Sequence, residues 1–276
     1  MKVTLWGTRG SLATAGPETV RYGGNTSCVE VRGADGTLLV LDAGTGIQRL
    51  NAGVGGITSV DVLLTHLHMD HLQGLGFFAP LYRPEVHVHI WGPASTTMDL
   101  QRRLVRYLSP PLFPVRLREL PCSLTLHDVP LGTFTIGGLA VTAALVSHPG
   151  PTVGYRVVEG GIALAYLPDH EPALGVRDFP AEPSWTSGFD LAAGADLLIH
   201  DVQFTDEEYP QYVGWGHSSI GQALAFARLA GVKRLVPFHH SPAHTDADLD
   251  RLLEQTRARE HPFAILPGKE GLTIEL

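Results

Sequence analysis

The feature that most constrains this chain is a dense group of imidazoles and carboxylates that follows a mostly apolar run. The run Val60–Thr65 leads directly into His66, His68, Asp70 and His71, so four potential metal ligands fall within six positions. A short apolar run of this kind is typical of a buried strand. Imidazole and carboxylate without thiolate favour Zn²⁺ and also accept Mn²⁺ or iron. The pattern therefore predicts a metal centre where a strand ends.

The same residue types follow four further predicted strands. They are His148 after the run to Val146, Asp169 after Ile162–Leu167, His200 and Asp201 after Leu197–Ile199, and His239 and His240 after Val232–Phe238. A single histidine is usually a buried core residue, but that explanation does not extend to five strands that end in the same residue types. We expect the fold to bring these strand ends together.

The other periodic segments predict strands with interspersed helices. The predicted strands are Lys2–Trp6, Ser27–Arg32, Thr37–Leu41, Phe134–Val146 and Val153–Val158, and the predicted helices are Ser95–Leu108, Ser218–Ala230 and Asp246–Arg259. Residues 172–194 are rich in Pro, Gly and acidic side chains and are interpreted as an excursion over the surface. This pattern is typical of two sheets covered by helices.

Composition narrows the class of protein. With 276 residues and 44% hydrophobic side chains, the chain can bury the core of one large domain. The formal charge of −8 disfavours nucleic acid as a general partner. No apolar run reaches the roughly 20 residues of a membrane span, and the polar start predicts no signal peptide. Cys28 and Cys122 are too few for a disulfide framework, so we expect a cytoplasmic protein.

A known superfamily shares the central pattern. The segment His66-Leu-His68-Met-Asp70-His71 resembles the His-x-His-x-Asp-His signature of the metallo-β-lactamase superfamily. Further residues in the family's order extend the resemblance over nearly the whole chain: Asp42 in Asp-Ala-Gly, His148, Asp169 and His239. The resemblance implies an α/β fold with one metallo-β-lactamase domain over residues 1–276, in which two mixed β-sheets flanked by helices form an αββα sandwich.

The resemblance also implies a site for two divalent ions, with zinc as the first choice and manganese as the second. The implied ligands are His66, His68 and His148 for one ion, Asp70, His71 and His239 for the other, and Asp169 as the bridge. Two ions about 3.5–4 Å apart can share a water, lower its pKa and hold the attacked oxygens, and Asp70 would orient that water as a base. A bridging Asp, where the lactamases have Cys, resembles the phosphodiesterase and other hydrolase branches.

A second resemblance, over residues 214–242, is to ribonuclease Z, in which His-Ser-Thr opens a helix that leads to the last metal-binding His. His217 matches the first of these histidines, and Asp201 stands where ribonuclease Z has Glu. A carboxylate that orients an imidazole keeps it cationic, so His217 would protonate a leaving alkoxide. The alternative is that His217 only opens the helix, with Ser218 or Ser219 as its cap.

Some neighbouring histidines remain to be assigned. His239 and His240 are adjacent on a strand, so only one of them can face the site. The C-terminal Phe-His-His-Ser resembles the corresponding ribonuclease Z motif in a way that favours His239. His170, beside Asp169, is expected in a solvated turn rather than against a substrate, and the roles of His200 and His240 stay open.

Gly-rich turns at residues 7–11 and 22–27 also fit the ribonuclease Z-like and cyclic-phosphodiesterase branch, and they let backbone amides approach an anion. Asn25 and Ser218 are candidate substrate contacts, although Asn25 is equally suited to a left-handed turn. Arg9 would meet a phosphate or form a surface salt bridge. We find no long Gly/Pro arm with basic residues, by which ribonuclease Z grips tRNA, and this favours a small substrate.

We therefore expect a metal-dependent hydrolase, and within that class a phosphodiesterase for a small cyclic or diester phosphate. One alternative is a lactone or ester hydrolase on the same metal site, which has less need of a cationic acid. Another is a ribonuclease Z-like nuclease, and the non-enzymatic alternative is a degenerate member that only binds a ligand. The expected partner is a small phosphate ester, no membrane is expected, and a homodimer is left open.

Overall fold

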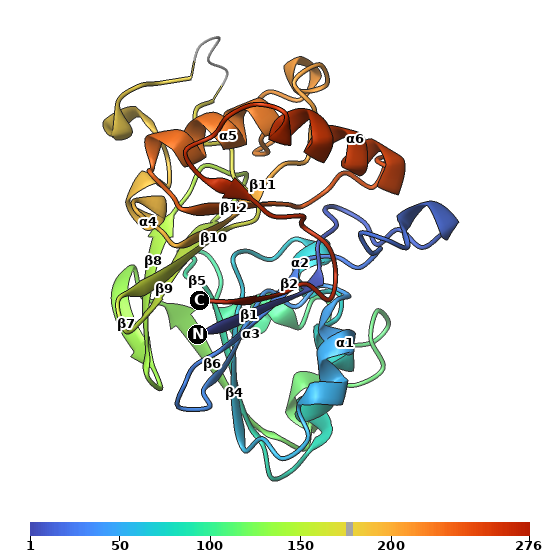
Figure 1. Cartoon of the computed structure of the whole chain (residues 1–276). Coiled ribbons are helices and arrows are strands. Elements are labelled where there is room, and N and C mark those ends of the chain that lie inside the picture. The colour runs from blue at the N-terminus through green and yellow to red at the C-terminus, as the bar shows by residue number, and fades with distance from the viewer. Residues whose placement is uncertain (175–178) are drawn as a thin grey trace.

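The computed structural model describes residues 1–174 and 179–276. Two β-sheets lie face to face and helices cover their outer faces, so the layers follow the order helix, sheet, sheet, helix (Figure 1). Within the described residues each sheet has seven strands. The αββα arrangement that the sequence predicts is confirmed.

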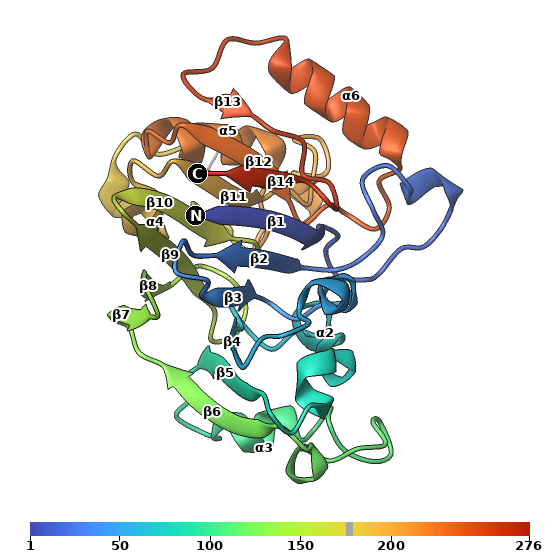
Figure 2. The same ribbon diagram turned by 60° about the horizontal axis from the view of Figure 1, so that its bottom comes forward.

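The first sheet has the strand order β14-β1-β2-β3-β4-β5-β6. Figure 2 shows these strands side by side, with the two ends of the chain adjacent because β14 pairs with β1. The strands are β1 (Lys2–Gly7), β2 (Cys28–Arg32), β3 (Leu38–Leu41), β4 (Ser59–Leu63), β5 (His87–Pro93), β6 (Ser123–Val129) and β14 (Thr273–Glu275).

The second sheet has the strand order β13-β12-β11-β10-β9-β8-β7. The strands are β7 (Gly132–Ile136), β8 (Leu139–Leu145), β9 (Val153–Glu159), β10 (Ile162–Leu167), β11 (Leu197–Asp201), β12 (Arg234–Phe238) and β13 (Ala264–Ile265).

The helices divide between the two outer layers (Figure 1). On the first sheet lie α1 (Ile47–Leu50), α2 (Met69–Leu72) and α3 (Leu100–Leu104), and on the second lie α4 (Phe189–Ala192), α5 (Ile220–Leu229) and α6 (Asp246–Arg257). Among the described residues, no helix has the length and apolar character needed to cross a membrane.

The core between the sheets follows from the two-residue period of a strand. In β3, Leu39 and Leu41 face the core between the sheets, whereas Leu38 and Val40 face the helical layer. Tyr166 and Phe238 enter the same core from the second sheet. Continuous apolar runs are what a strand buried on both faces requires, and this is why the runs in the sequence predict strands.

The topology of the two sheets explains why polar strand ends converge. Strands β3 to β6 run parallel to one another, and so do β10 to β13. The carboxyl ends of parallel strands lie at the same edge of a sheet, where open α/β sheets place their sites. The sequence places His and Asp shortly after β4, β10 and β12, and as the last two residues of β11. Both sheets therefore present these residues at their carboxyl edges.

One predicted strand is wrong. Residues Phe134–Val146 do not form a continuous strand but the antiparallel hairpin of β7 and β8. The turn falls at Gly137-Gly138, and Gly137 has a φ of 52°, a left-handed conformation that glycine adopts without strain. Two glycines between apolar runs are a hairpin signal that outweighs the continuity of the flanking runs.

The predicted helix Ser95–Leu108 is also shorter than expected. Only Leu100–Leu104 is α-helical, and the side chain of Asp99 caps it by accepting from the backbone N–H of Arg102 at 2.7 Å. Strands β5 and β6 are not among the predicted elements. The predicted surface excursion at residues 172–194 contains α4 and lies partly outside the described residues.

Candidate metal centre

The structure brings all seven predicted metal ligands together, in two neighbouring groups. Residues 64–71 continue from β4, and α2 begins among them at Met69. From the second sheet, His148 follows β8, Asp169 follows β10 and His239 follows β12. The two groups therefore lie where the edges of both sheets meet.

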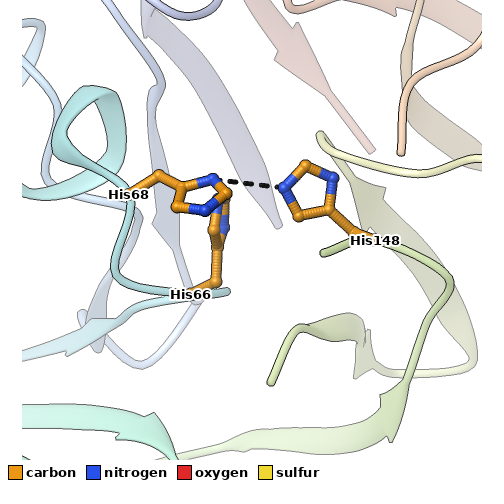
Figure 3. A group of neighbouring side chains, drawn as sticks. All are labelled: His66, His68 and His148. Carbon is orange, nitrogen blue, oxygen red and sulfur yellow. Dashed lines mark hydrogen bonds between the residues drawn. The ribbon is translucent and has the colours of Figure 1, made fainter. Parts of the chain in front are cut away.

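The first group is His66, His68 and His148 (Figure 3). Their ligand nitrogens all lie within 4.8 Å of one another, and His148 Nε2 is 3.2 Å from His68 Nδ1. His148 Nδ1 donates to the Gly216 carbonyl at 2.8 Å, and His66 Nδ1 lies 3.1 Å from the hydroxyl of Thr65. These bonds hold the two rings and leave Nε2 of each for a metal ion.

The second group is centred on Asp70, His71 and His239. Asp70 Oδ2 lies 3.3 Å from His71 Nε2 and 3.1 Å from His239 Nε2, and the two ring nitrogens are 3.4 Å apart. Atoms bound to one zinc ion at about 2.0–2.2 Å lie roughly 3–3.5 Å from each other. The spacing of these three atoms therefore suits one shared cation.

Asp169 lies between the two groups and is almost completely buried. Its Oδ1 is 2.9 Å from His71 Nε2 and 3.3 Å from His239 Nε2. Its Oδ2 is 3.8 Å from His66 Nε2 and 3.7 Å from His148 Nε2. One carboxylate oxygen thus faces each group, which is the arrangement that a bridging ligand requires.

Asp42 orients the second group, although the sequence assigns it no role beyond the resemblance. It is fully buried at the end of β3 and accepts from His71 Nδ1 at 2.8 Å. It also accepts from the backbone and hydroxyl of Thr65 and from the hydroxyl of Tyr166, at 2.7–3.1 Å. A carboxylate behind a ligating imidazole fixes its tautomer, so His71 presents Nε2 to the site.

Two residues at the site, each directly after a strand, have a left-handed backbone conformation. Asp42 after β3 has a φ of 59°, and His239 after β12 has a φ of 58°. Non-glycine residues rarely adopt this left-handed region, and such strain clusters at functional sites. Gly10 packs on the His239 ring, because a Cβ at Gly10 would lie 2.3 Å from His239 Nδ1. These turns aim both side chains at the centre.

The electrostatics of the cluster suit cations. Burial lowers the pKa of His66 well below its ordinary value, so the ring is neutral and able to ligate. Among the described residues, its buried Nε2 finds no hydrogen-bond partner. Burial also opposes a charge on His71, but Asp169, Asp70 and Asp42 outweigh it and raise the pKa of His71 well above its ordinary value. The donor set therefore fits divalent metal ions.

His217 lies beside this centre and is paired with Asp201. His217 Nδ1 donates to Asp201 Oδ2 at 2.7 Å, and its ring stacks on His239 with centroids 4.9 Å apart. Burial opposes the charge on His217, but Asp201 outweighs it and raises the pKa of His217 to about 9. The cap of α5 is Ser219, whose side chain accepts from the Gln222 backbone, so His217 is free of the capping role.

The structure places three other histidines behind the site. His170 is fully buried, which corrects the predicted solvated turn. It bonds through Nδ1 to His200 Nε2 at 3.0 Å, because the Asp169–Glu171 segment turns inward against α5. His240 points away from the centre and contacts the Gly268 carbonyl at 2.7 Å, whereas His239 faces the ligands.

The residues predicted to touch the substrate are engaged in structural hydrogen bonds. Asn25 Nδ2 donates to Glu270 at 3.0 Å, and the buried Ser218 hydroxyl donates to the His170 carbonyl at 2.6 Å. Arg9 is fully buried and does not form the predicted surface salt bridge. Its guanidinium donates instead to three backbone carbonyls on two other segments.

Glu171 is a buried carboxylate that the sequence analysis does not single out. It accepts from the Tyr209 hydroxyl at 2.5 Å and from the backbone of Gly214 and Gly216 at 2.9–3.1 Å. The Gly216 carbonyl in turn accepts from His148. Glu171 therefore anchors the loop that orients one candidate ligand and carries His217. The signal in the sequence is its position two residues after Asp169.

Comparison with known proteins identifies the family. The model of the beta-lactamase superfamily domain matches residues 37–240. A ribonuclease Z from Myxococcus xanthus is 30% identical, over 88% of this chain and 90% of the relative.

Solved structures share the fold over almost the whole chain. The metallo-beta-lactamase fold protein YhfI from Bacillus subtilis matches with a TM-score of 0.72 and 20% identity, over 99% of each chain. The short form of human tRNase Z matches with a TM-score of 0.68 and 23% identity, over 100% of this chain and 99% of the other. The chain belongs to the beta-lactamase superfamily and is a metal-dependent hydrolase with the metallo-β-lactamase fold.

Proposed function

We propose that this protein is a phosphodiesterase that uses two divalent ions, zinc or manganese, to hydrolyse a small cyclic or diester phosphate. The observation that carries the proposal is the His217–Asp201 pair beside the metal ligands. A phosphodiester with an alkoxide leaving group needs a proton at that oxygen, and a cationic imidazole supplies one. A lactone or activated ester has less need of such an acid.

Seven residues would hold the two ions of the proposed site. The ligands would be His66, His68 and His148 for one ion, Asp70, His71 and His239 for the other, and Asp169 for both. Bound there, the ions would neutralise phosphate charge and lower the pKa of a shared water.

Proton transfer would fall to one of the proposed ligands, Asp70, and to the His217–Asp201 pair beside them. Asp70, whose Oδ2 accepts from the backbone N–H of Ser11 at 2.8 Å, would orient the attacking water as base. His217 would give its proton to the leaving oxygen, and Asp201 would stabilise the imidazolium through Nδ1.

The proposal of a small substrate rests on charge. The chain carries a formal charge of −8, and a polyanion binds best to a basic face. Arg9 lies in the Gly-rich turn next to Asp70 but is buried and bound to backbone carbonyls. Asp206 and Glu207 are exposed on the segment that leads to His217. This surface suits one phosphodiester held by the ions better than a long phosphate chain.

The test is turnover by the protein loaded with Zn²⁺ or Mn²⁺. We expect metal-dependent hydrolysis of bis-(p-nitrophenyl) phosphate and of a 2′,3′- or 3′,5′-cyclic nucleotide. His217→Ala should slow the cyclic nucleotide more than the nitrophenyl ester, because nitrophenolate leaves without a proton. Absence of turnover on all of these, or a lactone panel that is hydrolysed well by His217→Ala, would contradict the proposal.

A ribonuclease Z-like nuclease is the second candidate, favoured by the names of the relatives. Exposed arginines around α3, namely Arg102, Arg106 and Arg118, would be its phosphate contacts. Cleavage of a tRNA precursor, with binding that weakens steeply as salt rises, is the outcome that would favour this candidate. Neutralising two of these arginines should then reduce the salt dependence.

A further inference from the structure

An aromatic group stands next to the proposed acid and plays no part in the chemistry described above. Phe204 and Tyr212 stack with centroids 4.4 Å apart and planes 3° from parallel. Trp215 contacts the Tyr212 ring edge to face at 5.2 Å, and Phe204 meets the His217 ring at 6.1 Å. The row of rings therefore runs from the acid to Trp215.

Trp215 is exposed where burial would be expected. Its exposed fraction is 60%, although indole is among the most apolar side chains and its neighbours in the row are more buried. The next residue, Gly216, is buried against His148, and a Cβ there would lie 2.5 Å from His148 Nδ1. The exposed indole thus belongs to the same short turn as Gly216, which packs against the proposed metal ligand His148.

The turn that carries Trp215 is held in place on both sides. Gly214 and Gly216 each have a φ of 85°, and their N–H groups donate to the buried Glu171 at 2.9–3.1 Å. The backbone N–H of Trp215 donates to the Tyr212 carbonyl at 3.0 Å. An aromatic surface held in this way loses little freedom when a flat ligand stacks on it.

We infer that Trp215 is a specificity-determining residue that stacks on the nucleobase of a nucleoside phosphodiester. The inference rests on the proposed function and names its substrate class. A phosphodiester at the metal centre places its alcohol groups beside His217, and the indole lies within two residues of that acid. Base–aromatic stacking needs no basic side chain and tolerates every base, which suits the acidic Asp206 and Glu207 on the same segment.

Binding of products tests the inference without turnover. Calorimetric titration of the metal-loaded protein should show AMP binding about tenfold more tightly than ribose 5-phosphate, which is the size expected of one stacked base. Trp215→Ala should remove most of this ratio, Trp215→Phe should keep much of it, and Trp215→Leu should behave like Ala. Trp185→Ala is the matched control, because Trp185 is 76% exposed on another segment, and it should leave the ratio unchanged.

Several outcomes would overturn the inference. The inference is wrong if the protein binds AMP no more tightly than ribose 5-phosphate, or if Trp215→Ala weakens the binding of both ligands equally. It is also wrong if Trp215→Leu keeps the affinity ratio, or if Trp185→Ala lowers that ratio as much as Trp215→Ala does. The proposed function is read separately from the metal-dependent hydrolysis of methyl p-nitrophenyl phosphate by the unmodified protein, because this diester has no nucleobase and its cleavage does not require one. A Trp215-dependent preference for AMP without any hydrolysis would contradict the proposed phosphodiesterase activity but support stacking of the base on Trp215.

Discussion

Asp169 and Asp201 are both buried carboxylates, but they face different partners. Asp169 meets imidazoles of both ligand groups, whereas Asp201 meets His217 and backbone N–H groups. Asp169→Ala should therefore release at least one ion and lower turnover by several orders of magnitude. Asp201→Ala should keep both ions and lose about 10²–10⁴-fold in rate on alkoxide leaving groups. Metal analysis and kcat on cyclic nucleotides measure the two effects.

The two carboxylates serve as controls for each other. On p-nitrophenyl esters the loss in Asp201→Ala should shrink, because that leaving group needs little protonation, while the loss in Asp169→Ala should not. If Asp169→Ala kept two tightly bound ions and Asp201→Ala shed one, the two roles would have to be exchanged.

His200 makes stability depend on pH. Burial lowers the pKa of His200 to about 4, against the charge of Asp201. An unfolded chain with an ordinary His binds that proton more readily, so stability is lost as pH falls from about 6.5 through 4. This one residue should cost about 2 kcal/mol between pH 7 and pH 4.5. Urea unfolding of the chelator-treated protein should show a smaller loss over that range in His200→Asn. An equal loss in both proteins would show that His200 is not the group responsible.

At the scale of elements, Asp42 joins the ends of three strands. It closes β3, accepts from Thr65 after β4, and accepts from Tyr166 in β10. Asp42→Ala should lower the free energy of unfolding by about 3 kcal/mol, because the buried His71 N–H and Tyr166 hydroxyl lose their acceptor. Metal affinity should fall about 10–100-fold as the His71 tautomer is released. Tyr166→Phe removes one of these bonds and should cost about 1 kcal/mol with metal affinity unchanged. Equal effects of the two variants would contradict this role of Asp42.

The elements that the sequence predicts well are those with uninterrupted apolar runs. Residues 162–167 form a strand with the predicted limits, since both faces of β10 are buried and every position is apolar. Strand β5 is missed because His87, His89 and Trp91 interrupt its apolar positions on the half-buried inner face. That strand forms because β4 and β6 pair with it on either side. The amino-acid composition of residues 87–93 alone does not predict this pairing.

In the site, too, some residues can be predicted from local sequence and others cannot. The strand ends in the sequence supply the candidate ligands, the resemblance to the superfamily selects seven of them, and the structure brings these seven together. Glu171, Gly216 and Asp42 act through partners 23–124 residues away in sequence. Contacts over such separations are created by the packing of the two sheets, so a single sequence carries only weak signals for them. His170 is buried for the same reason, because α5 covers a turn that is polar in sequence.

On the scale of the whole molecule, the proposed ligands come from both sheets. The residues from His66 to His71 extend from the first sheet, whereas His148, Asp169 and His239 extend from the second. Ions bound between them should stabilise the folded chain by about 2.7 kcal/mol per site at 100-fold excess over the dissociation constant. Chelation would remove this contribution from both sites, so the sheets should separate more easily.

Two such sites correspond to about 5 kcal/mol. We therefore expect chelation to lower the Tm of the main transition by roughly 10–20 °C, since domains of about 150–250 residues shift by roughly 2–4 °C per kcal/mol. Calorimetry before and after chelation, with metal content measured on the same samples, gives the shift, and added Zn²⁺ should restore it. Asp169→Ala should already melt near the chelated value and respond little to Zn²⁺, because it lacks the carboxylate that faces both ligand groups. A protein that loses both ions without a change in Tm would show that the sheets are held by their apolar core alone.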